Sequence, residues 1–367
     1  MARRDNCIPA DLSGKTVLVA RLSALGDIAI SLPLLYRVCR MFGDTCFIFL
    51  TKPRMEGLFV NGPANLTVFT LDFSEYHGAA GLWRLASRLR GEYRVDLFVD
   101  LHDVLRTKML RCFLKLRGVR CVHIDKGRAE KRALTRRCGK RLQQLKTSAE
   151  RYLETFCRAG IRIPDNEIRE TVSPASPPCT VYAPGGGPAE AFAAVSPPKA
   201  EGEYWLALAP FAAHEGKMYP LQLMDKVVKL FAARENVRIF LFGFGEKEEV
   251  EIEILREGCM DKTVNMARAH LGLSAELSLL SHCDAMLSMD SANMHLASLV
   301  GLRAVSVWGA THTFAGFYGA GQDPADAVQA DMPCRPCSIF GNKPCRRGDH
   351  ACLTKISPEK IVSALKS

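Results

Sequence analysis

Short apolar runs alternate with longer amphipathic segments along the first half of the chain. The runs are residues 15–20, 45–51, 66–72, 94–101 and 119–125. Between them, the segments that follow Gly26 and cover residues 81–90 and 103–116 carry apolar residues at helical spacing. Such alternation is typical of a parallel sheet with helices on both faces. We therefore expect a first α/β domain over residues 1–170.

The pattern stops and then starts again in the second half. Residues 171–203 are dominated by Pro, Gly, Ser and Ala, which predicts a linker that is mobile in part. Predicted strands follow at 204–210, 237–243, 284–289 and 303–309, with predicted helices at 220–234, 246–258, 291–301 and 357–366. This predicts a second parallel-sheet domain over residues 204–367. Ligands of such domains bind at the carboxyl ends of the strands, so we expect the two domains to face a shared cleft.

Composition is that of a globular protein, with 48% hydrophobic and 24% charged residues. No apolar run reaches the roughly 18–20 residues that a membrane span needs, and the first 15 residues contain no apolar signal-peptide core. We therefore expect a cytoplasmic protein. In that reducing compartment, most of the ten scattered cysteines among the 14 are expected to be small buried hydrophobic residues.

Positive charge is concentrated in the first half. Residues 1–170 carry a net charge of +13, whereas residues 171–367 carry −3. Within the first half, residues 126–146 hold nine Lys and Arg against one acid, Glu130. This segment is predicted to be a basic helix that meets an anionic partner, and a solvated helix face is the alternative.

The second half contains a predicted anion site at the start of a helix. An apolar strand runs directly into the segment "SMDSANMHLA", so the backbone amides of Ser291, Ala292 and Asn293 open a helix. Unpaired N–H groups and the helix dipole favour phosphate there, although Asp290 or Ser291 as an ordinary N-cap is an equal alternative. The loop "APFAAHEGKMYP" also follows a strand, and its Lys217 and His214 make a diphosphate site plausible.

A third loop, "LFGFGEKEE", is a weaker signal. Gly243 and Gly245 would let the backbone bend around a ligand, and Glu246 could accept hydrogen bonds from a ribose. Any turn from strand to helix can carry such glycines. Because the dinucleotide and P-loop fingerprints are missing from the sequence, the sequence supports neither a dinucleotide-binding site nor a P-loop.

Four cysteines near the end of the chain are clustered. Cys334, Cys337, Cys345 and Cys352 are spaced C-x2-C-x7-C-x6-C. They could hold a structural zinc ion, with His350 as an alternative ligand, form disulfides, or stay reduced. A structural role is preferred to a catalytic one.

Three segments together resemble a known family. "RLSALGDIAISLP", "PFAAHEGKMYP" and "MDSANMHLASLVG", in this order, resemble the glycosyltransferase family 9 heptosyltransferases of lipopolysaccharide core assembly. The resemblance spans nearly the whole chain. It implies the GT-B fold, with the acceptor on the N-terminal Rossmann-like domain and the nucleotide sugar on the C-terminal one.

The resemblance also implies a mechanism. Asp27 would be the general base that deprotonates the acceptor hydroxyl in an inverting displacement, at a turn where Gly26 keeps the backbone clear. Lys217 and the amides of residues 291–293 would stabilise the ADP leaving group without a catalytic metal. Asp290 would order that turn, where the family pattern has glycine in place of Ala292. The implied donor site comprises His214, Gly243, Gly245, Glu246, Asp290, Ser291, Ala292, Asn293 and His295.

On the acceptor side, the resemblance implies Arg21, Ser23, Gly26 and Arg106. The donor would be ADP-L-glycero-D-manno-heptose and the acceptor a Kdo or heptose residue of the inner core, at the inner face of the cytoplasmic membrane. The basic segment would meet Kdo carboxylates, lipid A phosphates or an anionic leaflet. A GT-B transferase for a UDP- or GDP-sugar is the first alternative. A non-catalytic protein that binds nucleic acid or another anion is the second, although the sequence contains no nucleic-acid-binding motif.

Overall fold

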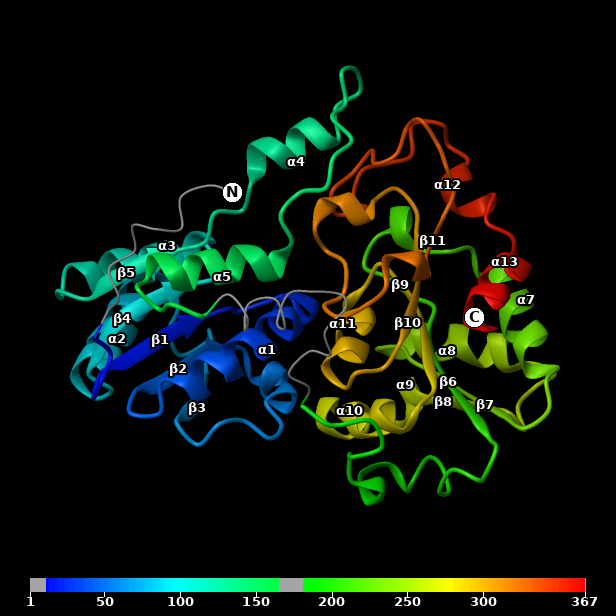
Figure 1. Ribbon diagram of the computed structural model, residues 1–367, viewed down its shortest axis with the longest axis horizontal. Helices are drawn as coiled ribbons and strands as arrows, with labels where there is room; N and C mark the ends of the chain where they lie inside the picture. The colour runs from blue at the N-terminus through cyan, green and yellow to red at the C-terminus, as the bar shows by residue number, and fades with distance from the viewer. Residues whose placement is uncertain (1–10, 165–180, 367) are drawn as a thin grey trace. The chain divides into compact units, whose positions relative to one another are not determined.

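The computed structural model describes residues 11–164 and 181–366. These residues divide into two compact α/β units (Figure 1). Of the described residues, unit 1 holds 11–126 and 148–164, and unit 2 holds 127–147 and 181–366. Each unit is built on one sheet, and all the strand pairs are parallel. The predicted fold class, two doubly wound parallel-sheet domains, is confirmed.

Unit 1 has a five-stranded sheet in the order β3-β2-β1-β4-β5. Its strands are β1 (Thr16–Ala20), β2 (Cys46–Thr51), β3 (Leu66–Thr70), β4 (Val95–Asp100) and β5 (Arg120–His123). Its helices are α1 (Leu25–Met41), the 3-10 helix η1 (Pro53–Leu58), α2 (Gly78–Gly91), α3 (Leu105–Lys115) and α5 (Ser148–Arg158). Leu18 and Ala20 join α2 and α3 in one core cluster, whereas α1 packs with α5. Since β1 is covered on both faces, it reads as a continuous apolar run.

Unit 2 has a six-stranded sheet in the order β11-β10-β9-β6-β7-β8. Its strands are β6 (Tyr204–Ala209), β7 (Val237–Leu241), β8 (Thr263–Asn265), β9 (Ala285–Met289), β10 (Ala304–Trp308) and β11 (Ala327–Gln329). Its α-helices are α4 (Arg128–Leu134), α7 (Leu221–Ala232), α8 (Glu246–Arg256), α9 (Met266–Ala269), α10 (Leu273–His282), α11 (Ala292–Leu299), α12 (Ala351–Thr354) and α13 (Pro358–Lys366). Its 3-10 helices are η2 (Ala189–Phe192), η3 (Glu215–Lys217), η4 (Thr313–Ala315) and η5 (Pro324–Asp326).

The core of unit 2 explains why these helices form. Leu206 and Leu208 of β6 pack with buried apolar residues of α7, α8 and α13. Trp205, which is 1% exposed, points the other way and contacts Phe192 and Phe240. Ser357 caps α13 as predicted, because its Oγ accepts a hydrogen bond from Lys360 N at 3.2 Å. No helix among residues 11–164 and 181–366 is long and apolar enough to cross a membrane.

Both sheets reverse their strand order at an inner position. In unit 1 the reversal lies between β1 and β4, and in unit 2 it lies between β6 and β9. Ligands of open parallel sheets bind at such a reversal, outside the carboxyl ends of the two strands. The loops that follow these four strands are therefore the first place to look for a site.

The basic segment (residues 126–146) differs from the prediction. It was expected to be a helix in the first domain, but only α4 is helical, and all of the segment except Lys126 groups with unit 2. Leu134 and Leu145 are buried in a small apolar cluster with Ala315, and Leu145 N donates to Phe314 O at 2.9 Å. Two buried leucines, rather than the charges, decide where the segment packs.

The predicted linker also differs in its described part. Residues 171–180 lie outside the described residues, but residues 181–203 pack on unit 2. Val181 N donates to Leu299 O at 2.7 Å, and the buried Phe192 contacts Trp205 and His282. A few apolar residues in a Pro-rich and Gly-rich segment are enough to hold it against the domain.

Candidate active site

In unit 2, the loops after β6 and β9 bring a cation and a carboxylate together. Lys217, in η3, places its Nζ 2.9 Å from Oδ2 of Asp290, which directly follows β9. The Lys217 side chain is 15% exposed and that of Asp290 is 4% exposed. The contact is an ion pair without hydrogen-bond alignment. The buried carboxylate therefore holds the ammonium group at the strand-order reversal and leaves its donors available to a ligand.

The helix that follows Asp290 begins without a side-chain cap. Ser291 is the N-cap residue of α11, but its Oγ shares a hydrogen bond of 3.1 Å with Ser288 Oγ and makes no cap bond. Ala292 and Asn293 are half-buried in the first turn, and His295 is buried one turn further. The first N–H groups of α11 can therefore accept an anion next to Lys217.

The two glycines in the loop after β7 are explained by the backbone geometry of the turn. Gly245, the N-cap of α8, has a φ of 85°, and a Cβ at Gly243 would lie 2.9 Å from Ile252 Cδ1. Glu248 accepts a hydrogen bond from Phe244 N at 2.7 Å and so closes the turn. Glu246 is exposed at the start of the helix, as is His214 on the Lys217 loop.

The cysteine loop (residues 334–352) packs against the Lys217 loop. Ala310 N donates to Gly216 O at 2.7 Å, and Cys337 N donates to Ala310 O at 3.0 Å. Gly341 has a φ of 75°, and a Cβ there would lie 2.6 Å from Cγ of Lys217. The cysteine loop therefore fixes the stem of the lysine that faces Asp290.

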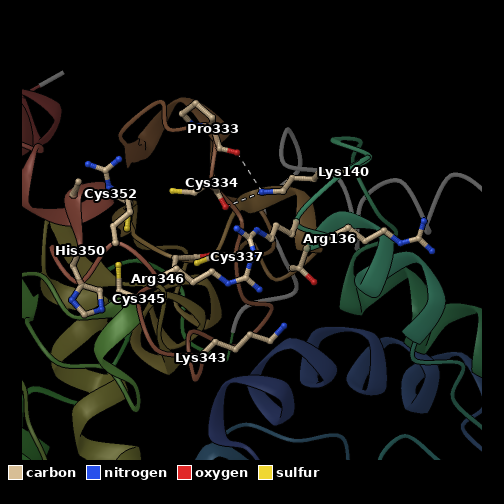
Figure 2. Close-up of a pocket in the computed structure, with 15 residues that line it drawn as sticks. Arg136, Lys140, Pro333, Cys334, Cys337, Lys343, Cys345, Arg346, His350 and Cys352 are labelled. Atoms are coloured by element: carbon tan, nitrogen blue, oxygen red, sulfur yellow. Dashed lines mark hydrogen bonds between the residues drawn. The ribbon is translucent and has the colours of Figure 1, made fainter.

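All four cysteines of this loop are free thiols that line one cavity of about 260 Å³ (Figure 2). Within the described residues, no group of three or more His, Cys, Asp and Glu side chains is placed to hold a metal ion. The described loop thus contains the reduced state that the spacing allowed, and a zinc ion there stays a prediction.

In unit 1, the turn after β1 places Asp27 in the first helical turn of α1. Its Oδ2 pairs with Nη2 of Arg21, and its Oδ1 accepts a hydrogen bond of 3.5 Å from the Tyr152 hydroxyl. The Asp27 side chain is 28% exposed, whereas Tyr152 is buried. Burial and the nearby carboxylate raise the pKa of Tyr152, so the phenol stays a hydrogen-bond donor. Both carboxylate oxygens are therefore oriented by the protein, and the exposed part of the Asp27 side chain can meet a substrate.

Arg21 and His102 tie this turn to the loop after β4. Nη1 of the buried Arg21 donates to Leu101 O at 2.7 Å, and Leu22 N donates to Nδ1 of His102 at 3.3 Å. Burial, reinforced by the charge of Arg21, lowers the pKa of His102 to about 3. The imidazole is therefore neutral, and its Nδ1 is the acceptor.

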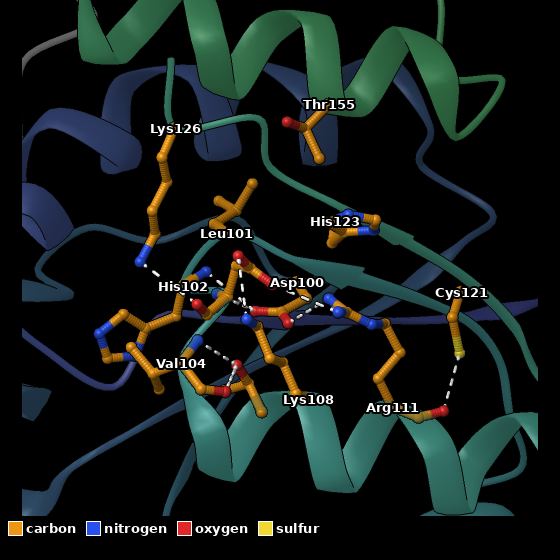
Figure 3. A network of polar contacts seen from close by, with 12 residues as sticks. Asp100, Leu101, His102, Val104, Lys108, Arg111, Cys121, His123, Lys126 and Thr155 are labelled. Atoms are coloured by element: carbon orange, nitrogen blue, oxygen red, sulfur yellow. Dashed lines mark hydrogen bonds and ion pairs between the residues drawn. The ribbon is translucent and has the colours of Figure 1, made fainter. Parts of the chain in front are cut away.

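A buried carboxylate organises the loop after β4 (Figure 3). Asp100, which is 0% exposed, accepts hydrogen bonds from His102 N at 2.9 Å, Asp103 N at 2.8 Å and Arg111 Nη1 at 2.8 Å. Lys108 pairs with Asp103 at 3.8 Å. Because every side-chain hydrogen bond of Asp100 goes to its own loop and helix, this carboxylate fixes the backbone that carries His102.

Arg106, predicted on the acceptor side, is exposed at the start of α3. Its guanidinium lies 4.0 Å from the ring centroid of Phe73, and Lys52 Nζ lies 5.8 Å from the same ring. Lys126 Nζ donates to Asp103 O at 3.3 Å. Cations from the ends of three strands therefore gather on the Asp27 side of the unit 1 sheet. Ser23 and the buried Gly26 belong to the turn that joins β1 to α1.

The sequence missed several of these residues. Tyr152 lies 125 positions from Asp27 on a helix without a recognisable motif. Asp100 lies at the end of the strand predicted at residues 94–101 and His102 directly follows that strand, so their position in "DLHDVLRTK" could have marked them. Phe73 and Lys52 follow predicted strands in the same way.

Comparisons with known proteins identify the family of this chain. Residues 83–343 match the profile of glycosyltransferase family 9 (heptosyltransferase), and the chain belongs to this family. It is 26% identical over 169 residues to lipooligosaccharide heptosyltransferase 2 of Campylobacter jejuni subsp. jejuni serotype O:2, which covers 45% of this chain and 51% of that protein. The chain thus spans about half the length of the curated relatives it matches.

Solved structures share the fold over nearly the whole chain. A glycosyl transferase family 9 protein from Veillonella parvula has a TM-score of 0.69 at 15% identity, with 98% of each chain covered. The E. coli heptosyltransferase WaaC with ADP has a TM-score of 0.64 at 18% identity, with 96% of this chain and 99% of that chain covered. Two Rossmann-like units of the heptosyltransferase type are therefore established for this chain.

Proposed function

We propose that this protein is an inverting glycosyltransferase. It transfers heptose from ADP-L-glycero-D-manno-heptose to a Kdo or heptose residue of the lipopolysaccharide inner core. One observation carries the proposal: each sheet presents one oriented charge at its strand-order reversal, Asp27 in unit 1 and Lys217 in unit 2. A carboxylate to take a proton and a cation to receive a diphosphate are the two groups that this reaction needs.

The relatives support the choice of donor. The Campylobacter relative is a lipooligosaccharide heptosyltransferase, and E. coli WaaC has been solved with ADP and with ADP-2-deoxy-2-fluoro heptose. The uncapped start of α11 beside Lys217 suits a diphosphate for the same physical reason in any nucleotide sugar. The nucleotide base and the sugar of the donor are therefore inferred from the relatives, and the diphosphate of the donor is inferred from the geometry.

The proposed step is a single displacement. Asp27 accepts the proton of the acceptor hydroxyl as its oxygen forms a bond to the anomeric carbon of the donor. The bond from that carbon to the diphosphate oxygen breaks on the opposite face, which inverts the configuration, and its electron pair leaves with ADP. Lys217 and the first N–H groups of α11 stabilise the charge that develops on the diphosphate. Arg21 and Tyr152 orient Asp27 throughout.

The cations around Asp27 suit an acidic acceptor. Arg106, Lys52 and Lys126 come from different strand ends, and the first two share the Phe73 ring. A Kdo carboxylate placed among them would present its neighbouring hydroxyl to Asp27, because arginine and lysine bind carboxylates at defined distances. Such an acceptor places the protein at the inner face of the cytoplasmic membrane, where the growing lipopolysaccharide core is anchored.

The first test is calorimetric titration of the protein with ADP, UDP and GDP. We expect ADP to bind more tightly than UDP and GDP, and Lys217→Ala to weaken ADP binding by about tenfold to a hundredfold, since a charge-assisted contact to phosphate is lost. Lys226→Ala, which removes an exposed lysine from α7, is the matched control and should bind ADP like the unaltered protein.

The outcomes separate the candidate functions. Selective ADP binding that depends on Lys217 supports the proposal and leads to a turnover assay with ADP-heptose. Preference for UDP or GDP would keep the mechanism and replace the donor. Failure to bind any of the three nucleotides would reject the transferase.

A further inference from the structure

A second concentration of positive charge lies in unit 2, in the cavity lined by the basic segment and the cysteine loop. Six cationic side chains line it, namely Arg136, Arg137, Lys140, Lys343, Arg346 and Arg347. Figure 2 shows Arg136 and Lys140 on the side of the basic segment and the four cysteines on the side of the loop. The proposed transfer reaction uses none of these residues.

The charge of this cavity is not neutralised by acids. No Asp or Glu is among its lining residues. Arg347 pairs with Asp349 at 3.0 Å, but Arg136, Arg137, Lys343 and Arg346 form no ion pair with any residue that the structure describes. Like charges that converge without a counter-ion repel one another, so a bound anion would stabilise this arrangement.

The basic segment is fixed to the loop at the cavity. Lys140 Nζ donates to three backbone carbonyls, those of Pro333 at 3.4 Å, Cys334 at 2.8 Å and Arg335 at 3.0 Å. Both walls of the cavity are therefore joined by hydrogen bonds within unit 2, and the cations on them keep a defined separation.

The buried cation Arg335 adds to the excess of positive charge around the cavity. Arg335 is 5% exposed, and its guanidinium donates only to neutral oxygens, including Gly309 O at 2.6 Å and Thr311 O at 3.0 Å. Buried charges are usually paired with an opposite charge. The chain supplies hydrogen bonds here but no carboxylate within contact.

From these features we propose that the cavity binds a phosphate group. A phosphate monoester carries about −1.5 to −2 charges and three acceptor oxygens, so it can meet several of these cations at once and balances more of their charge than a carboxylate does. A volume of about 260 Å³ is below the usual range of about 300–1,000 Å³ for drug-sized ligands and is large enough for a phosphate group. The phosphate is that of a lipid headgroup or of a small soluble ion.

The thiols in the cavity report its occupancy directly. The reduced protein, freed of reductant, is alkylated with neutral iodoacetamide, and the rate at each cysteine is followed by mass spectrometry. Pyrophosphate should slow Cys334 and Cys345 by about threefold or more, because a bound anion blocks access and disfavours the thiolate. Cys46 and Cys112, exposed in unit 1, are internal controls that should react at unchanged rates.

A charge-matched pair of variants locates the effect. Arg136→Gln with Arg137→Gln removes two cations that line the cavity, and the pyrophosphate concentration that gives half-maximal protection should rise by about fivefold. Arg132→Gln with Arg141→Gln removes the same charge from exposed positions of the same segment outside the lining, and protection should persist.

Two ligand sources are compared with the same readout. Protection by pyrophosphate indicates a soluble phosphate site. Protection by phosphatidylcholine vesicles that contain phosphatidic acid, but not by plain phosphatidylcholine vesicles or by pyrophosphate, indicates a lipid headgroup.

Three results would overturn the proposal. The first is absence of protection by any phosphate probe. The second is an equal loss of protection in both double variants, which would show diffuse charge attraction. The third is slow alkylation of all four cavity cysteines before any probe is added, relieved by a chelator, which would show that the thiols hold a metal ion. ADP titration of the cavity variants keeps this test separate from the proposed transfer reaction, since their ADP affinity should be unchanged.

Discussion

The two strand-order reversals of this protein have the same architecture and opposite charges at the centre. In unit 1, the proposed reacting group is a carboxylate, Asp27, and a buried cation, Arg21, holds it. In unit 2, the proposed reacting group is a cation, Lys217, and a buried carboxylate, Asp290, holds it. In both units the supporting residue is the more deeply buried partner, with exposed side-chain fractions of 9% for Arg21 and 4% for Asp290.

The difference shows how one fold divides a reaction. The sheet supplies a position outside the strand ends, and the loops decide which charge is presented there. If the proposed function holds, substitutions in unit 1 should change the chemical step, and substitutions around Lys217 should change nucleotide binding. Each prediction below tests that division.

The largest effect is expected from Asp27→Asn. The amide keeps the shape of the carboxylate but cannot take a proton, so kcat should fall by about 10²–10⁴-fold, the range for a general base and roughly 3–5 kcal/mol of activation free energy. ADP affinity, measured by calorimetry, should stay within about twofold. Asp44→Asn, at an exposed carboxylate of unit 1, is the control and should leave kcat unchanged. Near-normal turnover of Asp27→Asn would remove the base assignment.

Much of this division could be predicted from the sequence, because buried parallel strands read as apolar runs and the loops that follow them must meet at one edge. Lys217 was found in this way, whereas the role of Asp27 came from the resemblance to the family. Of the residues that orient these two side chains, one could be found from the sequence and one could not. Asp290 directly follows a strand and was found, whereas Tyr152 reaches Asp27 from α5 only after the chain folds. Strands of three residues, β8 and β11, are too short to show a period.

The next largest effect concerns stability in unit 1. Burial lowers the pKa of His102 to about 3, below its unfolded value of about 6.5. Between these values the unfolded chain binds a proton that the folded chain does not, so stability is present above pH 6.5 and is lost as the pH falls toward 3. His102→Asn, which keeps an acceptor for Leu22 N, should reduce the loss between pH 7 and pH 4.5 by about 2–3 kcal/mol in urea unfolding.

An exposed histidine of unit 2 is the control for this measurement. His214→Asn should leave the pH dependence of the unfolding free energy as it is in the unaltered protein. If His102→Asn also leaves it unchanged, the imidazole is hydrated and the unit 1 site is less enclosed than the contacts of Arg21 and Tyr152 indicate.

A smaller effect is expected from Gly341→Ala in unit 2. The new Cβ would lie 2.6 Å from Cγ of Lys217, so the lysine stem must move, and ADP affinity should fall by about tenfold, or 1.4 kcal/mol. Gly348→Ala introduces the same methyl at a similar positive φ, 78° against 75°, where no atom lies within 4 Å. It is the matched control for backbone strain. Equal ADP affinity in the two variants would show that the cysteine loop does not position Lys217.

The smallest effect is expected from Tyr152→Phe. This substitution is also the sharpest test of the proposed division between the chemical step in unit 1 and nucleotide binding in unit 2. The substitution removes the hydroxyl that donates to Asp27 at 3.5 Å and keeps the ring 6.0 Å from the Arg21 guanidinium. Since one neutral hydrogen bond is lost while Arg21 still holds the carboxylate, kcat should fall by about threefold to tenfold, near 1 kcal/mol. KM for the donor and ADP affinity should not change. A loss as large as that of Asp27→Asn would mean that the phenol itself carries the proton, and a loss of ADP affinity would mean that the two sites do not divide the reaction.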